Sequence, residues 1–294
     1  MLDNIILYFK NLPHTKRYVT ERLKQSWKSF LIVLAACLIL IIASETLFSF
    51  SHLTDVKEVR WLFRLIALIV FAVLMFTIYI SYHHYMNDFL VTKLFNISAA
   101  TPVVIMSILS FIMLVILTMI SALVKPVNFE TSYIALFYFI VMATIFVGLI
   151  SVTFGLIRLL TEKINIIFYG ICVLCFLVLP IIFIPNPNHV FINHILMLNP
   201  MYYIVNGIAQ SIIFGISSME NIPYHFYFIL FLCLIAAVNF VLARYTTHAI
   251  YNKTSKVTQT DNQQDVSKDS TDEADTSSRC LADLLCKLIC ENQK

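Results

Sequence analysis

Residues Trp61–Tyr82 read WLFRLIALIVFAVLMFTIYISY, and Arg64 is the only charged residue among them. A helix needs about 20 mainly apolar residues to cross the roughly 30 Å hydrocarbon core of a bilayer. Inside that core the backbone must satisfy its own hydrogen bonds, and a helix does this without a partner strand. The stretch therefore predicts a membrane-spanning helix.

Five further segments are similarly apolar and similarly long. They cover residues 30–50, 102–123, 134–160, 164–184 and 224–242. Of the 294 residues 60% are hydrophobic and 13% are charged, and no Lys or Arg occurs between Ile164 and Ala243. A soluble domain needs more polar surface than this. We therefore expect an all-α integral membrane protein with six transmembrane helices in a domain over residues 30–250.

Residues 1–29 carry an apolar stripe along one side of a predicted helix. Leu2, Ile5, Ile6 and Phe9 follow the helical spacing i, i+3, i+4 and i+7, and six Lys or Arg residues occur before residue 30. A basic amphipathic helix that precedes a membrane span usually lies in the membrane interface. We predict such an interfacial helix on the cytoplasmic side; the alternative is a solvated helix of a soluble domain.

The distribution of basic residues predicts the orientation, because cytoplasmic segments carry an excess of Lys and Arg. With a cytoplasmic N-terminus, six spans place 16 of the 20 basic residues inside and four outside, the latter being Lys57, Arg60, Arg64 and Lys125. Both termini are then cytoplasmic, in a multi-pass protein of the cytoplasmic membrane.

Two segments around the last predicted span do not fit a spanning helix. Residues 185–223 are apolar for a loop, and Met201–Phe214 predicts a helix too short and too polar to span, which favours a re-entrant or interfacial position. Residues 251–294 are rich in Ser, Thr, Asp and Gln, so we expect a disordered tail that ends in a short helix rich in Cys and Leu.

Residues with catalytic or ligand-binding patterns are scarce. The five glycines are scattered and form no phosphate-binding loop, and no metalloprotease or nucleophile motif occurs. The net charge of +3 and the lack of a basic stripe with interleaved aromatics argue against nucleic-acid binding. Cys37, Cys172, Cys175 and Cys233 lie inside apolar runs, which favours buried side chains over ligands. We predict no catalytic residue, metal site or cofactor in this chain.

Two ionisable residues fall within or beside predicted spans. Glu45 lies near the outer end of the first span and Arg64 near the outer start of the second. Charged side chains cost several kcal/mol in the membrane, about 2.5–3.5 at a helix centre, so an ion pair between them is one interpretation. In the other, both extend to the interface. The sequence has no chain of buried carboxylates, which argues against an ion-coupled transporter.

The loop between the second and third predicted spans carries the first motif. Residues 87–97 read NDFLVTKLFNI. They are similar to the Asn-Ala-Asn-Leu-Ile-Lys-Lys-Val-Tyr-Phe-Pro segment of the type-2 ABC exporter permeases that move polysaccharides and teichoic acids. Asn87, Leu90 and Lys93 match identically, whereas Ile97 replaces the terminal proline. In that family the region is a coupling helix that contacts the ATPase subunit, and the resemblance implies this role for Asn87, Phe89, Leu90, Lys93 and Phe95.

A second motif precedes the last predicted span. Residues 198–207 read LNPMYYIVNG and resemble the Leu-Asn-Pro-x-Tyr-Tyr-Ile-Val-x-Gly signature of teichoic acid translocation permeases. The resemblance places Asn199, Pro200, Tyr202, Tyr203 and Gly207 on the outer side, where aromatic rings could stack on sugars along a substrate path. The resemblance extends over about residues 1–250.

The resemblance implies a permease subunit that moves lipid-linked wall teichoic acid or a related polysaccharide. Its expected partners are a separate ATP-binding subunit that holds ATP and Mg, a second copy of this chain, membrane lipids and the lipid-linked polymer. A drug, peptide or bacteriocin is the alternative cargo. A membrane glycosyl- or acyltransferase and a membrane scaffold are alternatives of other classes.

Overall fold

The computed structural model describes residues 2–51, 55–94, 100–125, 130–161, 163–182, 190–215 and 219–265. Over these ranges the chain forms helices and no strand, which confirms the predicted all-α class. The chain divides into two units, residues 1–244 and 245–294, and the features below belong to the first unit unless stated otherwise.

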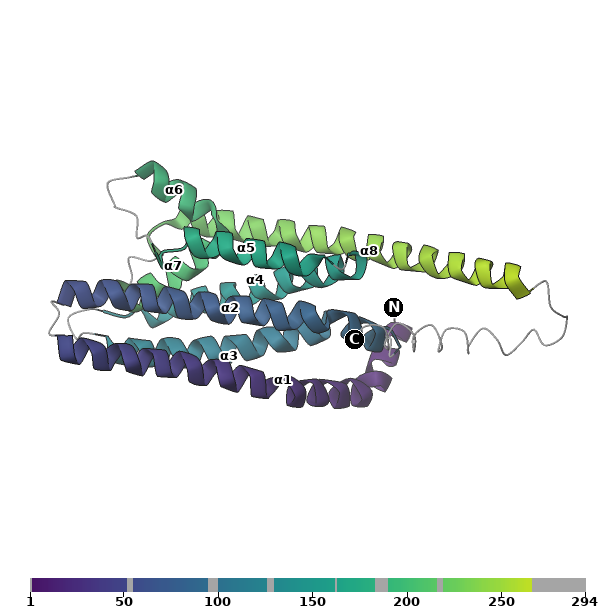
Figure 1. Cartoon of the computed structure of the whole chain (residues 1–294), viewed down its shortest axis with the longest axis horizontal. Helices are drawn as coiled ribbons and strands as arrows, with labels where there is room; N and C mark the ends of the chain where they lie inside the picture. Colours follow the sequence, from purple (N-terminus) through teal and green to yellow (C-terminus); the bar gives the residue numbers. More distant parts are fainter. Residues whose placement is uncertain are drawn as a thin grey trace. The chain divides into compact units, whose positions relative to one another are not determined.

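Eight helices make up the described chain, as Figure 1 shows. Their bounds are α1 Leu2–Ser51, α2 Asp55–Leu94, α3 Thr101–Val124, α4 Tyr133–Leu160, α5 Ile164–Val178, α6 Val190–Leu198, α7 Pro200–Ile213 and α8 Ile222–Asp265. Of these, α1, α2, α3, α4 and α8 are long and apolar enough to cross a membrane by length and composition. A multi-pass membrane protein is therefore supported, with five such helices where the sequence predicts six spans.

The fifth predicted span, residues 164–184, is helical over α5 only. At a rise of 1.5 Å per residue, the 15 residues of α5 reach about 22 Å, which is less than the hydrocarbon core. Pro180 accounts for the early end, because a proline disfavours the helical conformation of the residue before it. Leu179 is accordingly extended, with φ −71° and ψ 156°. Six spans stay a prediction.

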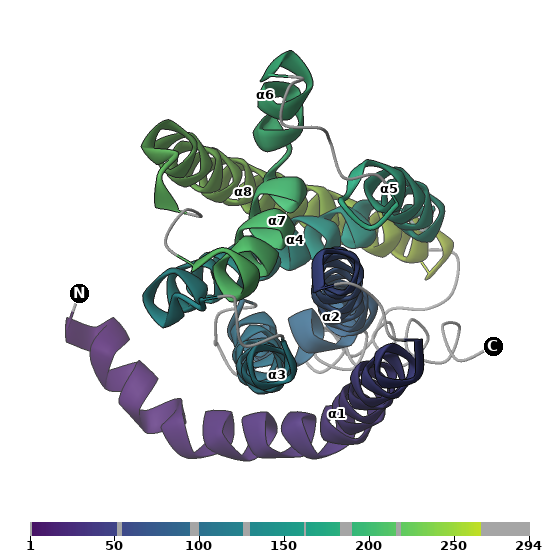
Figure 2. The ribbon, with the colours of Figure 1, turned by 90° about the vertical axis from the view of Figure 1, so that its left-hand side faces the viewer.

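The predicted interfacial helix and the first span are one continuous helix, α1. Figure 2 shows its N-terminal part, in purple, curving away from the axis of the rest of the helix. Many large apolar side chains of α1 are exposed, among them Ile32 at 70% and Ile39 at 65%. These side chains suit contact with lipid, so α1 has the character of an outer helix.

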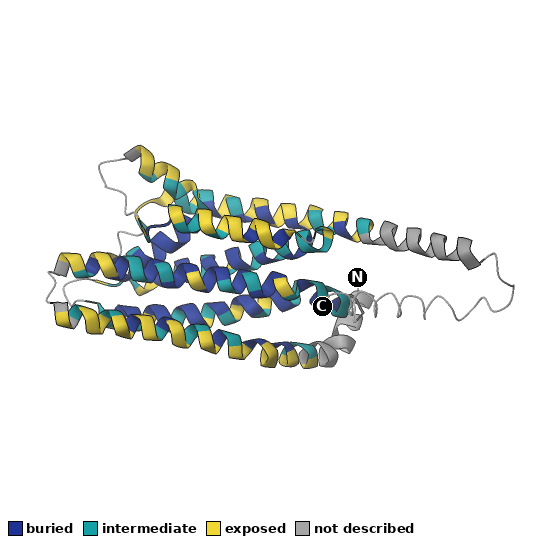
Figure 3. Cartoon of the chain, viewed as in Figure 1, coloured by how far each residue is buried: buried dark blue, intermediate teal, exposed yellow. Residues whose placement is uncertain are grey.

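Helix α2 lies at the centre of the bundle and packs against α3, α4 and α7 and, less extensively, against α1, which packs mainly against α3. Its residues Ala67, Val70, Val73 and Leu74 are completely buried. Figure 3 shows this dark-blue core running along α2 and through α7, whereas much of α1 and α5 is yellow. Helix α8 is joined to α4 by Asn239, whose side chain donates to the Leu149 carbonyl at 2.9 Å and accepts from Thr153 at 2.7 Å.

Helix α8 continues to Asp265, beyond the residue at which the sequence predicts a disordered tail to begin. A polar segment can extend an existing helix at little cost, because the unfavourable nucleation step has already been made. The predicted Cys- and Leu-rich terminal helix lies outside the described residues, and disorder beyond Asp265 stays a prediction.

Two glycines allow helices to approach closely. A Cβ atom at Gly155 of α4 would lie 2.3 Å from the Tyr85 ring, and one at Gly207 of α7 would lie 2.3 Å from Cε1 of Phe139. Tyr85 and Phe139 are 2% and 1% exposed, so neither ring has room to withdraw. Small residues at such contacts are common in membrane bundles, where close backbone approach increases van der Waals attraction.

Replacing Gly207 with alanine tests this packing. The added methyl group overlaps the buried Phe139 ring, so Gly207→Ala should lower the free energy of unfolding by about 1–3 kcal/mol. Gly170→Ala is the matched control, because a Cβ atom there meets nothing within 4 Å. Denaturant unfolding in mild detergent measures both variants. Equal stability of Gly207→Ala and wild type would contradict the close α4–α7 contact.

Candidate functional site

The predicted coupling segment, residues 87–97, begins on the last turns of α2 and not in a loop. Helix α2 continues unbroken to Leu94, so the first eight residues of the segment extend a central helix. Asn87 is exposed, and Phe89 and Leu90 are half-buried. The side chain of Lys93 and the whole of Phe95 lie outside the described part of the structure. Any force on this segment would act directly on α2.

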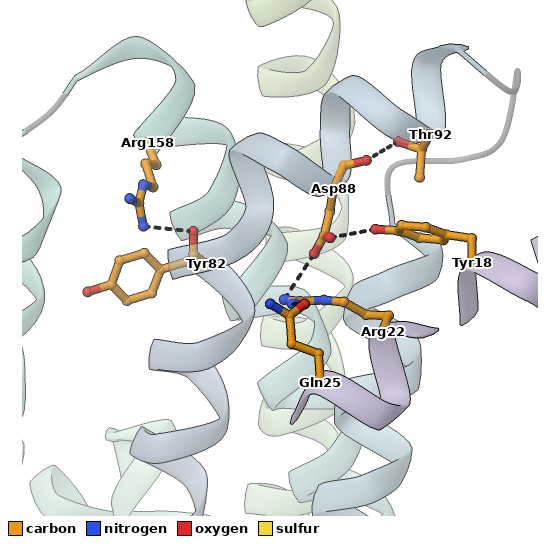
Figure 4. A network of polar contacts seen from close by, with 7 residues as sticks. All are labelled: Tyr18, Arg22, Gln25, Tyr82, Asp88, Thr92 and Arg158. Atoms are coloured by element: carbon orange, nitrogen blue, oxygen red, sulfur yellow. Dashed lines mark hydrogen bonds and ion pairs between the residues drawn. The ribbon is translucent and has the colours of Figure 1, made fainter. Parts of the chain in front are cut away.

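Asp88, inside this segment, forms a buried ion pair with α1. Its Oδ2 lies 3.3 Å from Nη2 of Arg22, and the two side chains are 8% and 4% exposed. The Tyr18 hydroxyl, one turn before Arg22 on α1, donates to Oδ1 of Asp88. Figure 4 shows both α1 side chains directed at the carboxylate. We call Tyr18, Arg22 and Asp88 the α1–α2 ionic cluster.

Neighbouring hydrogen bonds fix both sides of the ionic cluster. Nη1 of Arg22 donates to Oε1 of Gln25 at 3.1 Å, and the Thr92 hydroxyl donates to the backbone carbonyl of Asp88 at 2.8 Å. Nε and Nη2 of Arg22 are buried without a hydrogen-bond partner, so Nη2 meets Asp88 as an ion pair only. Removing two charges from water costs several kcal/mol per ion, and their attraction repays this only in good geometry. The cluster therefore specifies how α1 and α2 pair more than it adds net stability.

The sequence interpretation missed this cluster. Arg22 was assigned to the interface with the other basic residues of the N-terminal helix, and Asp88 was only a member of the motif. One signal was present: Asp88 is the only acidic residue between Glu58 and Glu130. A lone carboxylate beside apolar residues needs a cation, and the spacing of Tyr18 and Arg22 puts both on one side of α1. Nothing in the sequence, however, says which cation is near.

The second motif builds the start of α7. Asn199 is the N-cap, and its side chain accepts a hydrogen bond from the Met201 amide at 3.0 Å. Pro200 occupies the first helical position, where its missing N–H leaves no bond unmade. Tyr202 and Tyr203 are 3% and 4% exposed. The motif thus starts a helix that packs in the core of this chain, and the predicted role in a substrate path stays a prediction.

Several polar contacts hold the ends of α7 and its neighbours. The Tyr203 hydroxyl hydrogen-bonds Nδ1 of His225, and the Tyr227 hydroxyl donates to the Leu198 carbonyl at 2.9 Å, so both ties reach α8. At the other end, Lys125 and Thr131 both donate to the Ile212 carbonyl, at 3.2 and 2.9 Å.

Desolvation lowers the pKa of Lys125, an effect that Glu130 opposes. Burial raises the pKa of Tyr202 to about 12, so its phenol is neutral.

Glu45 and Arg64 have different surroundings. Glu45 is exposed on α1. The Arg64 guanidinium lies 5.5 Å from the centre of the Trp61 ring, and its Nε is buried without a hydrogen-bond partner. The ion pairs among the described residues include Arg17–Glu21 and Arg22–Asp88. The Glu45–Arg64 pair stays a prediction.

In the ranges that the structure describes, no three His, Cys, Asp or Glu residues gather as metal ligands would. The absence of a metal or cofactor from the whole chain stays a prediction. No protein-family model and no curated protein matches the chain. The functional assignment therefore depends on the chain's own residues and on the two sequence motifs.

Breaking the ionic cluster should be costly, whereas replacing it should not be. Asp88→Asn leaves Arg22 buried without a counter-charge, and we expect a loss of about 3–5 kcal/mol in the free energy of unfolding. The double variant Arg22→Met with Asp88→Leu removes both charges and should recover most of this loss. Denaturant unfolding in detergent provides the comparison.

Glu21→Gln is the control for this experiment, because Glu21 forms an exposed ion pair with Arg17 at 3.2 Å. Exposed pairs contribute about 0–1 kcal/mol, so this variant should remain close to wild type. If Asp88→Asn is as stable as Glu21→Gln, Asp88 is not buried against a cation and the cluster is wrong.

Proposed function

We propose that the chain is the membrane-spanning permease subunit of an ATP-driven exporter of the type-2 ABC class. Its cargo is lipid-linked wall teichoic acid or a related polysaccharide, which it moves across the cytoplasmic membrane. The observation that carries the proposal is the ionic cluster. Asp88 lies within the segment that resembles a coupling helix, and a buried ion pair joins it to Arg22 of α1.

This arrangement suits the transmission of force. A partner that pushes on the last turns of α2, where Asn87 is exposed, moves α1 through the ion pair and moves α4 through the close contact of Tyr85 with Gly155. Packed helices resist deformation, so the push displaces them as rigid bodies. Three long helices then respond to a single contact, as an alternating-access exporter requires.

The remaining parts of the exporter are separate molecules. The sequence contains no phosphate-binding loop, so an ATP-binding subunit supplies ATP and Mg, and Phe89, Leu90 and Phe95 beside Lys93 form the surface that it contacts. Two copies of this chain enclose the polymer path, and both termini are cytoplasmic. The chain itself catalyses no reaction. A drug, peptide or bacteriocin is the alternative cargo.

The second motif acts in this scheme by holding the outer end of the bundle together. Asn199 and Pro200 start α7, and Tyr202, Tyr203 and Gly207 are packed inside the chain. Their burial supports a role in shaping the outer mouth of the path in preference to contact with sugars.

Co-purification tests the proposal directly. The full chain, expressed with the genes beside its own and extracted in mild detergent, should bring down a stoichiometric ATP-binding subunit. Lipid-linked polymer should then raise ATP hydrolysis. A chain that purifies alone under every condition would overturn the exporter assignment and favour a membrane scaffold.

The predicted coupling surface can be tested in the same complex. Phe89→Ala combined with Phe95→Ala removes the two aromatic side chains expected to enter the ATPase subunit. Large apolar side chains dominate such contacts, so polymer-stimulated hydrolysis should fall on the order of tenfold while the chain remains folded. Phe226→Ala is the control, because Phe226 is 70% exposed on α8, away from the segment. Unchanged stimulation in the double variant would rule out this surface.

A further inference from the structure

A second arginine, Arg158, lies at the same end of α2 as the ionic cluster. It belongs to the last turn of α4 and is half-buried. Helix α4 has 28 residues, and at 1.5 Å per residue Arg158 is about 17 Å from its midpoint. Half of a typical hydrocarbon core is about 15 Å. A centred α4 therefore brings Arg158 to the level of the lipid headgroups.

The Arg158 guanidinium has few partners. Nη1 donates to the Tyr82 backbone carbonyl at 3.3 Å, and the group lies 5.9 Å from the centre of the Tyr82 ring. Figure 4 shows this contact apart from the ionic cluster. No carboxylate of the described residues forms an ion pair with it. Arginine has five N–H donors, so one edge is anchored and most donors remain for a ligand.

The described residues near Arg158 are cationic or neutral. His83 and His84 lie near enough to interact electrostatically with it. The Tyr82 hydroxyl donates to Asn165 at 3.1 Å, so the first turn of α5 contacts the far end of the Tyr82 side chain. That turn contains no acidic residue, and Lys163 before it is exposed.

We propose that Arg158 binds the phosphate group of a membrane lipid. The planar guanidinium matches two phosphate oxygens at once, which an ammonium does not. The Tyr79 ring lies 6.4 Å from the Tyr169 ring and is stacked on His83. These aromatic side chains offer apolar ring faces and polar atoms to the rest of a headgroup. A lipid phosphate is the anion that headgroup depth supplies. The proposal does not depend on the exporter function.

Two simpler roles for Arg158 must be distinguished from a lipid site. A cation in the last turn of a helix is stabilised by the helix dipole without any ligand. Glu162, which lies outside the described residues, is four positions away in the sequence and could neutralise the guanidinium. Each role predicts a different response to substitution.

The test measures lipid binding to the purified full chain by native mass spectrometry. The probes are phosphatidic acid and the diacylglycerol with the same acyl chains, which differ only in the phosphate. Wild type should retain phosphatidic acid and not diacylglycerol. Arg158→Gln should weaken the binding of phosphatidic acid about tenfold, equivalent to 1.4 kcal/mol. Arg158→Lys should lose less of this affinity.

Arg244→Gln is the matched control, because Arg244 lies 4.6 Å from the centre of the Phe240 ring on α8 and is likewise an arginine on an aromatic side chain. It should bind phosphatidic acid as wild type does. An equal loss of phosphatidic acid binding in Arg158→Gln and Arg244→Gln, or no loss of binding in either variant, would overturn the proposal. Elution of each variant as wild type does in size-exclusion chromatography separates loss of the site from misfolding.

Two further arms identify the ligand. Inorganic phosphate should displace bound phosphatidic acid at least about tenfold less well than added phosphatidic acid does. Equal displacement by the two would assign the site to free anions. Glu162→Gln should bind as wild type does. If wild type fails to bind and Glu162→Gln does bind, Glu162 occupies the guanidinium and there is no lipid site.

Discussion

A carboxylate buried among apolar helices must have a cation beside it, and Asp88 meets this requirement through Arg22. The positions of α1 and α2 depend on this pair, because a shift of either helix would leave a buried charge unpaired. Apolar contacts alone fix such positions loosely, since leucine and isoleucine side chains pack nearly as well one turn away. The ionic cluster thereby adds a polar constraint on how α1 pairs with the end of α2.

The opposite end of the bundle uses hydrogen bonds and close packing in place of charge. Gly207 lets α7 approach Phe139 of α4, Tyr203 of α7 hydrogen-bonds His225 of α8, and Tyr227 of α8 donates to Leu198 of α6. One end of α2 thus carries the first motif and the ion pair to α1, while the other end packs against a nearly buried short helix. A force applied at the first end is carried along a helix whose middle is completely buried, so little of it is lost to local bending.

Much of the fold could be predicted from the sequence, because apolar length alone separates a membrane helix from other structures. The end of α4 at Leu160 and a short helix at about residue 201 were both correct. The predicted end at residue 184 was wrong by six residues, because Pro180 ends α5 at Val178. The burial of Tyr202 and Tyr203 could not be predicted, since a tyrosine near a membrane end suits both an interface and a core. The ionic cluster joins residues 66 positions apart, and no local pattern records such a contact.

The distance between positions Glu21 and Asn87 tests the central claim most directly. Both residues are exposed, and each precedes a member of the Arg22–Asp88 pair by one position. Spin labels at the two sites, in the full chain reconstituted in lipid nanodiscs, report the α1–α2 distance by double electron–electron resonance. The account predicts one narrow distance distribution in wild type that broadens in Arg22→Gln. A broad distribution in wild type, or one that Arg22→Gln leaves unchanged, would contradict an ion pair that holds α1 to the end of α2.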